Sequence, residues 1–513
     1  MLMRKDASQD SSRKSATHIA RAKGNAMTNP RAALVDRTRR SVPRPTGTGD
    51  EPFLGTLASS MVSSDMPHRY GRQHPQLPSV VSVEAWDGAE LRQSAPERVA
   101  RSPEASLLKA VVFACLGVLA STPAQAQSDD VVTPVELFDP DVGDGVRLSP
   151  AFVLYPQVTT ELAYDSNIYN LDAPAIDDAV VSVRPRLVVR SDFARHELRF
   201  EAGADIRRYI DTSSEDSEQY RINAGTLLEL GSNIDVEGSA GYSRGVERRG
   251  TAGDALFTDR PVVFHEKEAS VEISRAGNRL EIGVGGSVLK RDYEDATLNG
   301  LPIDLDFRDV LLSRVQARVD YRFSAKTEAF SEVGLRALDY DVLSAPNRDS
   351  DGFFGLIGVS HELSELLEVE AAIGYLQQDF DEPAFETAKE INYRLEARWT
   401  PKPDWRFTAR AARDVDPSRV RDSAAVIASS FRLTAEHAVG DKLLLAADAQ
   451  YLEEDYRGQL RQDQRITLAA SATYRLADRI GVIAAASYRD QDGGDFGRTY
   501  DGFAVSIGVR ASW

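Results

Sequence analysis

The sequence is poor in cysteine and histidine, and this scarcity limits the chemistry that it can carry. Its single cysteine, Cys115, lies before residue 127, so the rest of the chain has no thiol for disulfides, covalent catalysis or zinc–thiolate sites. No G-x-S-x-G, H-E-x-x-H or phosphate-loop motif is present. We therefore predict a protein that is not an enzyme and has no metal site or other cofactor. Its histidines after residue 126 are scattered: His196, His265, His361 and His437.

Long hydrophobic runs are also missing. The longest, residues 107–120, is shorter than the roughly 20 residues of a membrane-spanning helix. Together with a mean hydropathy of −0.34, this excludes a bundle of transmembrane helices. The net charge is −18 and no basic patch dominates, which disfavours nucleic acid as a partner.

The apolar run 107–120 has the anatomy of a secretory signal. Arg101 and Lys109 supply the positive flank, and Ala124-Gln125-Ala126 supplies an A-x-A cleavage site. We predict a signal peptide over residues 99–126, with Ala124 and Ala126 as its cleavage residues. Residues 1–98 are rich in Ser, Arg and Pro and show no sustained apolar period. We interpret them as a disordered extension, or as sequence upstream of the true translation start.

From residue 151 to Trp513 one pattern repeats, after a short segment 127–150 that we expect to lie in the periplasm. Segments alternate apolar and polar side chains, which is typical of strands with one apolar and one polar face. These segments are long enough to provide the roughly 9–11 tilted residues that cross a bilayer, whereas soluble strands have about 5–6. The alternation is less clean at 261–275 and 326–340.

Short and long connections follow one another in strict alternation. This order is typical of an up-and-down barrel with short periplasmic turns and long outer loops. Eight hairpins plus a first and a last strand predict an all-β transmembrane barrel of about eighteen antiparallel strands over 151–513, with sixteen as the alternative. The short connections lie near 191–195, 231–232, 276–277, 324–325, 364–365, 401–403, 439–440 and 477–478, and the long ones include 211–219, 292–306, 381–386, 414–422 and 489–498.

Two stretches resemble known sequences. Tyr164-Asp165-Ser166-Asn167-Ile168-Tyr169 resembles the opening of the outer-membrane β-barrel porins associated with exopolysaccharide gene clusters. The ending looks like the signal read by the barrel assembly machinery, carried by Phe503, Val505, Ile507, Val509 and Trp513. The resemblance covers about 147–513 and implies a pore or a secretion-associated barrel. It fixes no transported compound and carries over no functional residue.

In a barrel of this size the inward faces are polar and line water. The alternation predicts two basic groups and an acidic group on those faces. We hypothesise that these opposed sectors select polar or charged solutes; the alternative is that neighbours pair and merely solubilise the wall. The predicted pore-lining residues are Arg184, Arg186, Arg199, Arg207, Arg394, Arg398, Arg406, Arg410 and Arg432, and Asp235, Glu237, Glu272, Glu281, Glu368 and Glu370.

The outer loops are expected to be acidic. Since no twelve-residue calcium-loop spacing occurs, a solvated rim is favoured over a cation site. The acidic residues assigned to this rim include Glu215, Asp292, Glu453, Glu454, Asp455, Asp490 and Asp492.

These observations predict a passive channel in the bacterial cell outer membrane for small polar or charged solutes. The alternative is an accessory outer-membrane barrel for exopolysaccharide export or secretion. Expected partners are outer-membrane lipid and lipopolysaccharide, periplasmic chaperones and the barrel assembly machinery. The alternative adds exopolysaccharide export components, and neither interpretation involves nucleic acid.

Overall fold

The computed structural model describes residues 133–139, 145–231, 233–251, 258–341, 347–418, 420, 422–494 and 497–513. The predicted extension 1–98, the signal peptide 99–126 and its residues Ala124 and Ala126 lie outside these ranges. Within them, no helix is long and apolar enough to span a membrane.

Eighteen long strands form the wall of the molecule. They are β2 (Phe152–Asp165), β3 (Asp178–Ser191), β4 (Glu197–Tyr209), β5 (Ser217–Leu230), β6 (Ile234–Val246), β7 (Val263–Ala276), β8 (Leu280–Tyr293), β11 (Val310–Ser324), β12 (Thr327–Tyr340), β13 (Ser350–Ser364), β14 (Leu367–Phe380), β15 (Ala388–Lys402), β16 (Trp405–Pro417), β17 (Ala425–Val439), β18 (Leu443–Tyr456), β19 (Gln462–Ala477), β20 (Ile480–Asp492) and β21 (Tyr500–Ser512).

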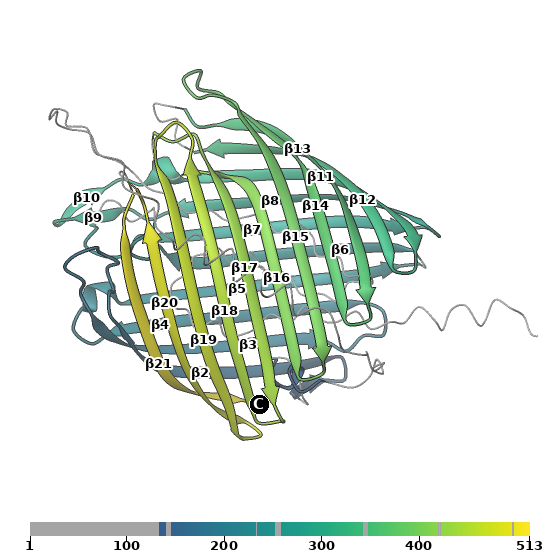
Figure 1. Ribbon diagram of the computed structural model, residues 1–513, viewed down its shortest axis with the longest axis horizontal. Helices are drawn as coiled ribbons and strands as arrows, with labels where there is room; N and C mark the ends of the chain where they lie inside the picture. The colour runs from purple at the N-terminus through teal and green to yellow at the C-terminus, as the bar shows by residue number, and fades with distance from the viewer. Residues whose placement is uncertain are drawn as a thin grey trace, which may run out of the picture. The chain divides into compact units, whose positions relative to one another are not determined.

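The wall is a closed antiparallel barrel. Each strand pairs with the next in the chain, as Figure 1 shows for the neighbouring strands. The last strand, β21, returns to pair with β2, with Ser512 opposite Gln157 and Ala504 opposite Asp165. The predicted all-β class and the count of eighteen are confirmed, and each predicted short connection joins the two strands of a hairpin. The segments with less clean alternation form the regular strands β7 and β12.

Three smaller elements were not predicted. Strand β1 (Val146–Ser149) pairs with the start of β2, where β21 has already ended. The hairpin of β9 (Ala296–Leu298) and β10 (Leu301–Ile303) lies in the connection between β8 and β11. Short 3-10 helices include η1 (Glu136–Phe138), which precedes the barrel.

The two faces of the wall differ in polarity. On β21, Val505 and Ile507 are 45% and 60% exposed, whereas Ala504 between Phe503 and Val505 is fully buried. The same alternation places exposed large apolar side chains along the other strands, for example Ile373 on β14 and Ile282 on β8. Such an extensive apolar outer face is stable in lipid rather than in water.

The prediction of a wholly solvated acidic rim is wrong in part. Strands β8, β18 and β20 extend further than expected, so Asp292, Glu453–Asp455, Asp490 and Asp492 lie in strands rather than in loops. Glu215 and Glu454 are 4% and 3% exposed. A carboxylate near a strand end can point to the solvent or to an arginine inside the barrel, and the local sequence does not distinguish the two.

Candidate functional site

The strand register places every predicted pore-lining residue on the inner face, opposite the exposed apolar side chains. Pairing carries this face from strand to strand: Glu237 lies opposite Glu272, Glu368 opposite Arg398, and Arg410 opposite Arg432. By strand, these residues are Arg184 and Arg186 on β3, Arg199 and Arg207 on β4, Asp235 and Glu237 on β6, Glu272 on β7, Glu281 on β8, Glu368 and Glu370 on β14, Arg394 and Arg398 on β15, Arg406 and Arg410 on β16, and Arg432 on β17.

Inside the barrel many of these charges pair with nearby opposite charges. On β3 and β4, Arg186 and Arg199 lie 2.8 and 3.4 Å from Glu201. On β15 and β16, Arg398 and Arg410 share Glu396 at 3.6 and 3.5 Å. Further pairs are Arg184 with Glu161, Arg207 with Asp205, and Arg432 with Asp448. The basic groups therefore carry their own counter-charges. The electrostatic potential at each point of the lumen then depends mainly on the nearest ion pairs.

One network of ion pairs is centred on Glu332, a residue that the sequence pattern does not indicate. Its fully buried carboxylate lies 3.4 Å from Arg314 of β11 and 3.3 Å from Arg394 of β15. Arg318 joins the network through Glu370 at 3.3 Å and Asp320 at 2.8 Å. Since two strands separate β12 from β15, the contact between Glu332 and Arg394 crosses part of the lumen. The charged groups of this network therefore extend into the interior of the barrel.

At the end of the barrel with the long connections, described residues of three connections meet. Arg348 is 1% exposed and donates hydrogen bonds to the carbonyl oxygens of Ser418, Val420 and Phe307. Its guanidinium also stacks on Tyr340 at 4.2 Å. One buried cation thus joins three connections, those after β8, β12 and β16.

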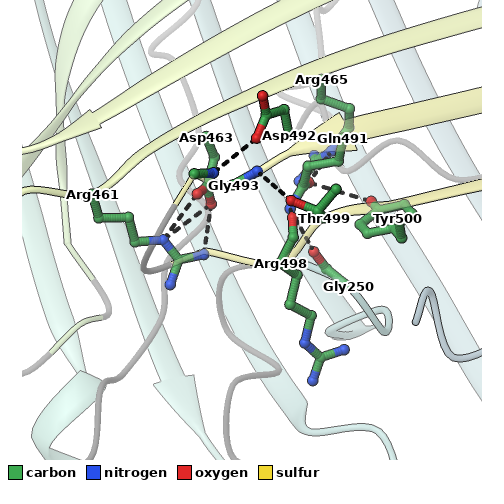
Figure 2. Close-up of polar contacts among 11 residues, drawn as sticks. Gly250, Arg461, Asp463, Arg465, Gln491, Asp492, Gly493, Arg498, Thr499 and Tyr500 are labelled. Carbon is green, nitrogen blue, oxygen red and sulfur yellow. Dashed lines mark hydrogen bonds and ion pairs between the residues drawn. The ribbon is translucent and has the colours of Figure 1, made fainter. Parts of the chain in front are cut away.

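A second network joins the connection after β6 to the ends of β19 to β21 (Figure 2). The Gln491 side-chain oxygen accepts hydrogen bonds from Arg465 at 2.8 and 2.6 Å and from the Tyr500 hydroxyl at 3.3 Å. The Gln491 amide donates to the carbonyl oxygens of Arg498 at 3.0 Å and Gly250 at 3.5 Å. The Gly250 carbonyl oxygen therefore ties its connection to Gln491 of β20. A cavity lies beside this network.

At the end with the short turns, the segment 133–139 lies against the inner face. Thr133 and Glu136 bond reciprocally, N–H to side-chain oxygen, at 2.7 and 3.3 Å, which fixes the turn. Phe138 lies 5.9 Å below the Arg475 guanidinium of β19, and Asp139 accepts hydrogen bonds from Arg406 of β16. The sequence predicts this region only as a short periplasmic segment.

The four histidines after residue 126 lie apart, and each has its own contacts. His196 accepts a hydrogen bond from the Glu229 N–H, and His361 shares one with Thr327 at 2.9 Å. His437 stacks on Trp405 at 4.1 Å. His265 lies 2.8 Å from both the Tyr242 hydroxyl and Glu294. No two of these four histidines share a site.

Two groups of three aspartates lie near the long connections, with carboxylate oxygens within 4.8 Å of one another. The groups are Asp292, Asp309 and Asp341, and Asp295, Asp304 and Asp306. Lys290 lies 3.4 Å from Asp292 and 2.7 Å from Asp341, so it supplies a positive charge to the first group. Burial and the neighbouring carboxylates of Asp292, Asp306 and Asp341 raise the pKa of Asp309 to about 6. The absence of a metal site stays a prediction.

The C-terminal residues expected to signal assembly lie on the strand that closes the barrel. Phe503, Val505, Ile507 and Val509 are exposed on the outer face of β21. The backbone N–H of Trp513 donates to the Pro156 carbonyl oxygen at 3.1 Å, so the last residue lies at the seam with β2.

Comparison with known families decides the family of the chain. The family described as "Putative beta-barrel porin 2" matches residues 144–513. The chain belongs to this family. The resemblance to outer-membrane β-barrel porins is thus confirmed, and this β-barrel porin is an outer-membrane protein of the transport class.

Solved structures of barrels are similar to this porin-family chain, at low identity. The copper transporter OprC is 8% identical with a TM-score of 0.41, over 72% of this chain and 82% of that chain. An anion-selective porin from Comamonas acidovorans is 11% identical with a TM-score of 0.33, over 71% and 99%. A BenF-like porin from Pseudomonas fluorescens Pf-5 is 10% identical with a TM-score of 0.37, over 70% and 99%. A search of the curated proteins found no match.

Proposed function

We propose that the protein is a passive channel for small polar or charged solutes in the bacterial cell outer membrane. The observation that carries this proposal is the contrast between the two faces of one closed wall. The outer face is apolar on strand after strand, and the inner face carries arginines, glutamates and aspartates. A charged inner face binds water, so the lumen favours hydrated solutes over apolar ones.

The ion pairs along the inner face bear on selectivity. Arg394 and Arg398 each lie within 3.6 Å of a carboxylate, so their positive charge is balanced nearby. A solute in the lumen would then meet alternating charges rather than one uniform field. We expect weak selectivity along most of the barrel and stronger selectivity where one sign of charge is in excess.

An accessory barrel for exopolysaccharide export or secretion is the second candidate. The connections that meet at Arg348 and the segment 133–139 favour it, because they place protein at both ends of the lumen. A barrel occupied in this way would conduct only after a partner rearranged it. The two candidates differ in what the isolated protein does.

Single-channel recording separates the candidates. The protein, extracted from outer membranes, is reconstituted into a planar bilayer and its current is measured in potassium chloride. Steady openings support the channel. A folded, heat-modifiable barrel that never conducts would overturn it in favour of the accessory role.

The hypothesis of opposed charge sectors has its own test. Arg394, Arg398 and Arg410 are replaced together by Glu, and the reversal potential in a salt gradient is measured. A shift toward cations is expected if these residues set the field. Unchanged ion selectivity would leave the paired, solubilising role as the explanation, and Arg195→Glu, at an exposed short turn, is the control.

A further inference from the structure

The cavity beside Gln491 lies at the end of the barrel with the long connections. Strands β2, β4, β5, β6, β19, β20 and β21 contribute to its lining. The connection after β6 adds Glu247, Arg248, Arg249 and Thr251. Gly250 has a φ of 78° and approaches Asn170 and Tyr500 so closely that a Cβ would meet them at 2.5 and 2.9 Å. Only glycine fits there without strain, and the connection is therefore held close to the cavity.

Arginines outnumber carboxylates in the lining of this cavity, and Arg207 pairs with Asp205, which is not part of the lining. Five arginines contribute to it, against the three carboxylates of Asp165, Glu215 and Glu247. Each of these carboxylates is already in an ion pair: Asp165 with Arg489 at 2.6 Å, Glu215 with Arg249 at 2.7 Å, and Glu247 with Arg308 at 3.2 Å. The arginines of the lining are Arg207, Arg248, Arg249, Arg465 and Arg489.

Arg465 shows how this excess is accommodated. It is 4% exposed, and in the described part of the chain it has no ion-pair partner. Its guanidinium donates instead to the neutral side chain of Gln491, at 2.8 and 2.6 Å (Figure 2). The carboxylates of Glu454 and Asp463 also act on Arg465, without a direct ion pair. A bound anion would add a direct charge-assisted hydrogen bond to its guanidinium.

Arg248 adds a second cation, from the connection rather than from a strand. Burial and the nearby guanidinium of Arg207 lower its pKa to about 9. Burial in the first place, and Arg207 in the second, make its positive form costly, and an anion in the cavity would lower that cost.

Neutral hydrogen-bonding groups complete the lining. Ser217, Gln219 and Thr251 offer hydroxyl and amide groups, and Tyr209 and Tyr500 offer phenol hydroxyls on aromatic rings. Such groups suit the hydroxyls of a small solute, whereas guanidinium groups suit the paired oxygens of a carboxylate or phosphate.

We propose that this cavity is a binding subsite for the oxyanion of a small hydroxylated solute. The inference rests on the proposed channel function, since it places the subsite on the route of the solute. It deepens that function by naming the chemical class: carboxylates or phosphates of polyhydroxylated compounds, in preference to neutral compounds of the same size.

Calorimetry tests the subsite directly. The detergent-solubilised protein, extracted from outer membranes, is titrated with glucuronate, inorganic phosphate and glucose. We expect saturable binding of glucuronate and of phosphate and none of glucose. Comparing the first two probes distinguishes a preference for carboxylate from one for phosphate.

Variants locate the binding. Replacing Arg248 and Arg465 together by Gln is expected to weaken glucuronate binding at least about tenfold, because each loss removes a charge-assisted hydrogen bond. Arg208→Gln is the matched control: it is next to Arg207 but on the outer face, where it pairs with Glu218. Arg248 lies outside the strands. The single variant Arg248→Gln therefore keeps the test valid if the double variant does not fold, as judged by heat-modifiable migration.

The outcomes are distinct. No saturable binding by the unaltered protein, or equal binding by the Arg248 variants, overturns the subsite. Conductance in potassium chloride is recorded on the same preparation. Binding without conductance would reject the channel and keep the subsite. Conductance without binding would reject the subsite and keep the channel.

Discussion

Asp139 and Arg406 are 267 positions apart in the chain, and the Arg406 guanidinium donates hydrogen bonds to both Asp139 carboxylate oxygens, at 3.2 and 3.5 Å. Arg406 also donates to Glu436 of β17 at 2.5 and 3.0 Å. One guanidinium therefore joins the N-terminal segment to two strands of the wall. Since Arg406 is the second residue of β16, this contact lies at the short-turn end of the lumen.

The first prediction concerns this contact. Replacing Asp139 by Asn and Phe138 by Ala removes the charge that pairs with Arg406 and the ring below Arg475. We expect the segment to leave the lumen more often, so the single-channel conductance should rise and proteolysis near residues 133–139 should become faster. Asp192→Asn, at an exposed short turn, is the control and should change neither. Unaltered conductance in the double variant would contradict a role of the segment in narrowing the pore.

The second prediction concerns the buried network at Glu332. Glu332→Gln leaves Arg314, Arg318 and Arg394 with less counter-charge in a site closed to solvent, and breaking a buried ion pair costs about 3–5 kcal/mol. Glu218→Gln removes an exposed partner of Arg208 and should change the free energy of unfolding by about 0–1 kcal/mol. Urea unfolding in detergent measures both. Equal losses would mean that water reaches the network.

The third prediction concerns assembly. Trp513 ends the strand that closes the barrel, and we propose that the assembly machinery recognises the apolar row from Phe503 to Trp513. Trp513→Ala is expected to lower the amount of heat-modifiable barrel in the outer membrane while leaving synthesis unchanged. Leu460→Ala, at an 89% exposed side chain in a connection, is the control. Normal outer-membrane levels of the Trp513 variant would argue against this signal.

The fourth prediction concerns pH. The pKa of Asp309 is raised from 3.8 to about 6 by burial and by the neighbouring aspartates. Between these values the folded protein binds more protons than the unfolded chain, so the free energy of unfolding should fall as pH rises toward about 6. Asp309→Asn still accepts the Tyr293 N–H hydrogen bond of 2.7 Å but does not titrate. Its stability, measured by urea unfolding at several pH values, should depend less on pH over this window, and identical profiles would contradict the assignment.

The wall could be predicted from the sequence because its pattern is local. Val505 faces out and Ala504 faces in because successive side chains of a strand point to opposite faces, and lipid requires the outer ones to be apolar. The same rule places Arg394 and Glu370 inside without knowledge of their partners. Turn positions followed from the points where the alternation stops.

The alternation of apolar and polar residues is less clear where aromatic rings face inward. Phe330 of β12 lies under the Arg318 guanidinium at 3.7 Å, and Phe354 of β13 lies under Arg314 at 3.9 Å. An apolar residue on the inner face blurs the period, so the segment 326–340 alternates poorly and Glu332 does not stand out in the sequence. Stacking of cations on rings makes such inward phenylalanines favourable.

The meeting of three connections at Arg348 could not be predicted for a different reason. The partners of Arg348, the carbonyl oxygens of Phe307, Ser418 and Val420, lie 41 to 72 positions away. No periodicity links residues at such separations. Only the closed wall brings them together.

The pairing of β1 with β2 has a consequence for the seam of the barrel. Strand β21 covers β2 from Gln157 onward, and β1 continues along the same strand opposite Phe152, Val153 and Leu154. Without β1, backbone N–H and carbonyl groups at this corner would face the membrane border unsatisfied, and a bare strand edge recruits other strands. The four residues of β1 thus cover the exposed edge of β2. They keep this edge from losing its hydrogen bonds and from pairing with a strand of a neighbouring molecule.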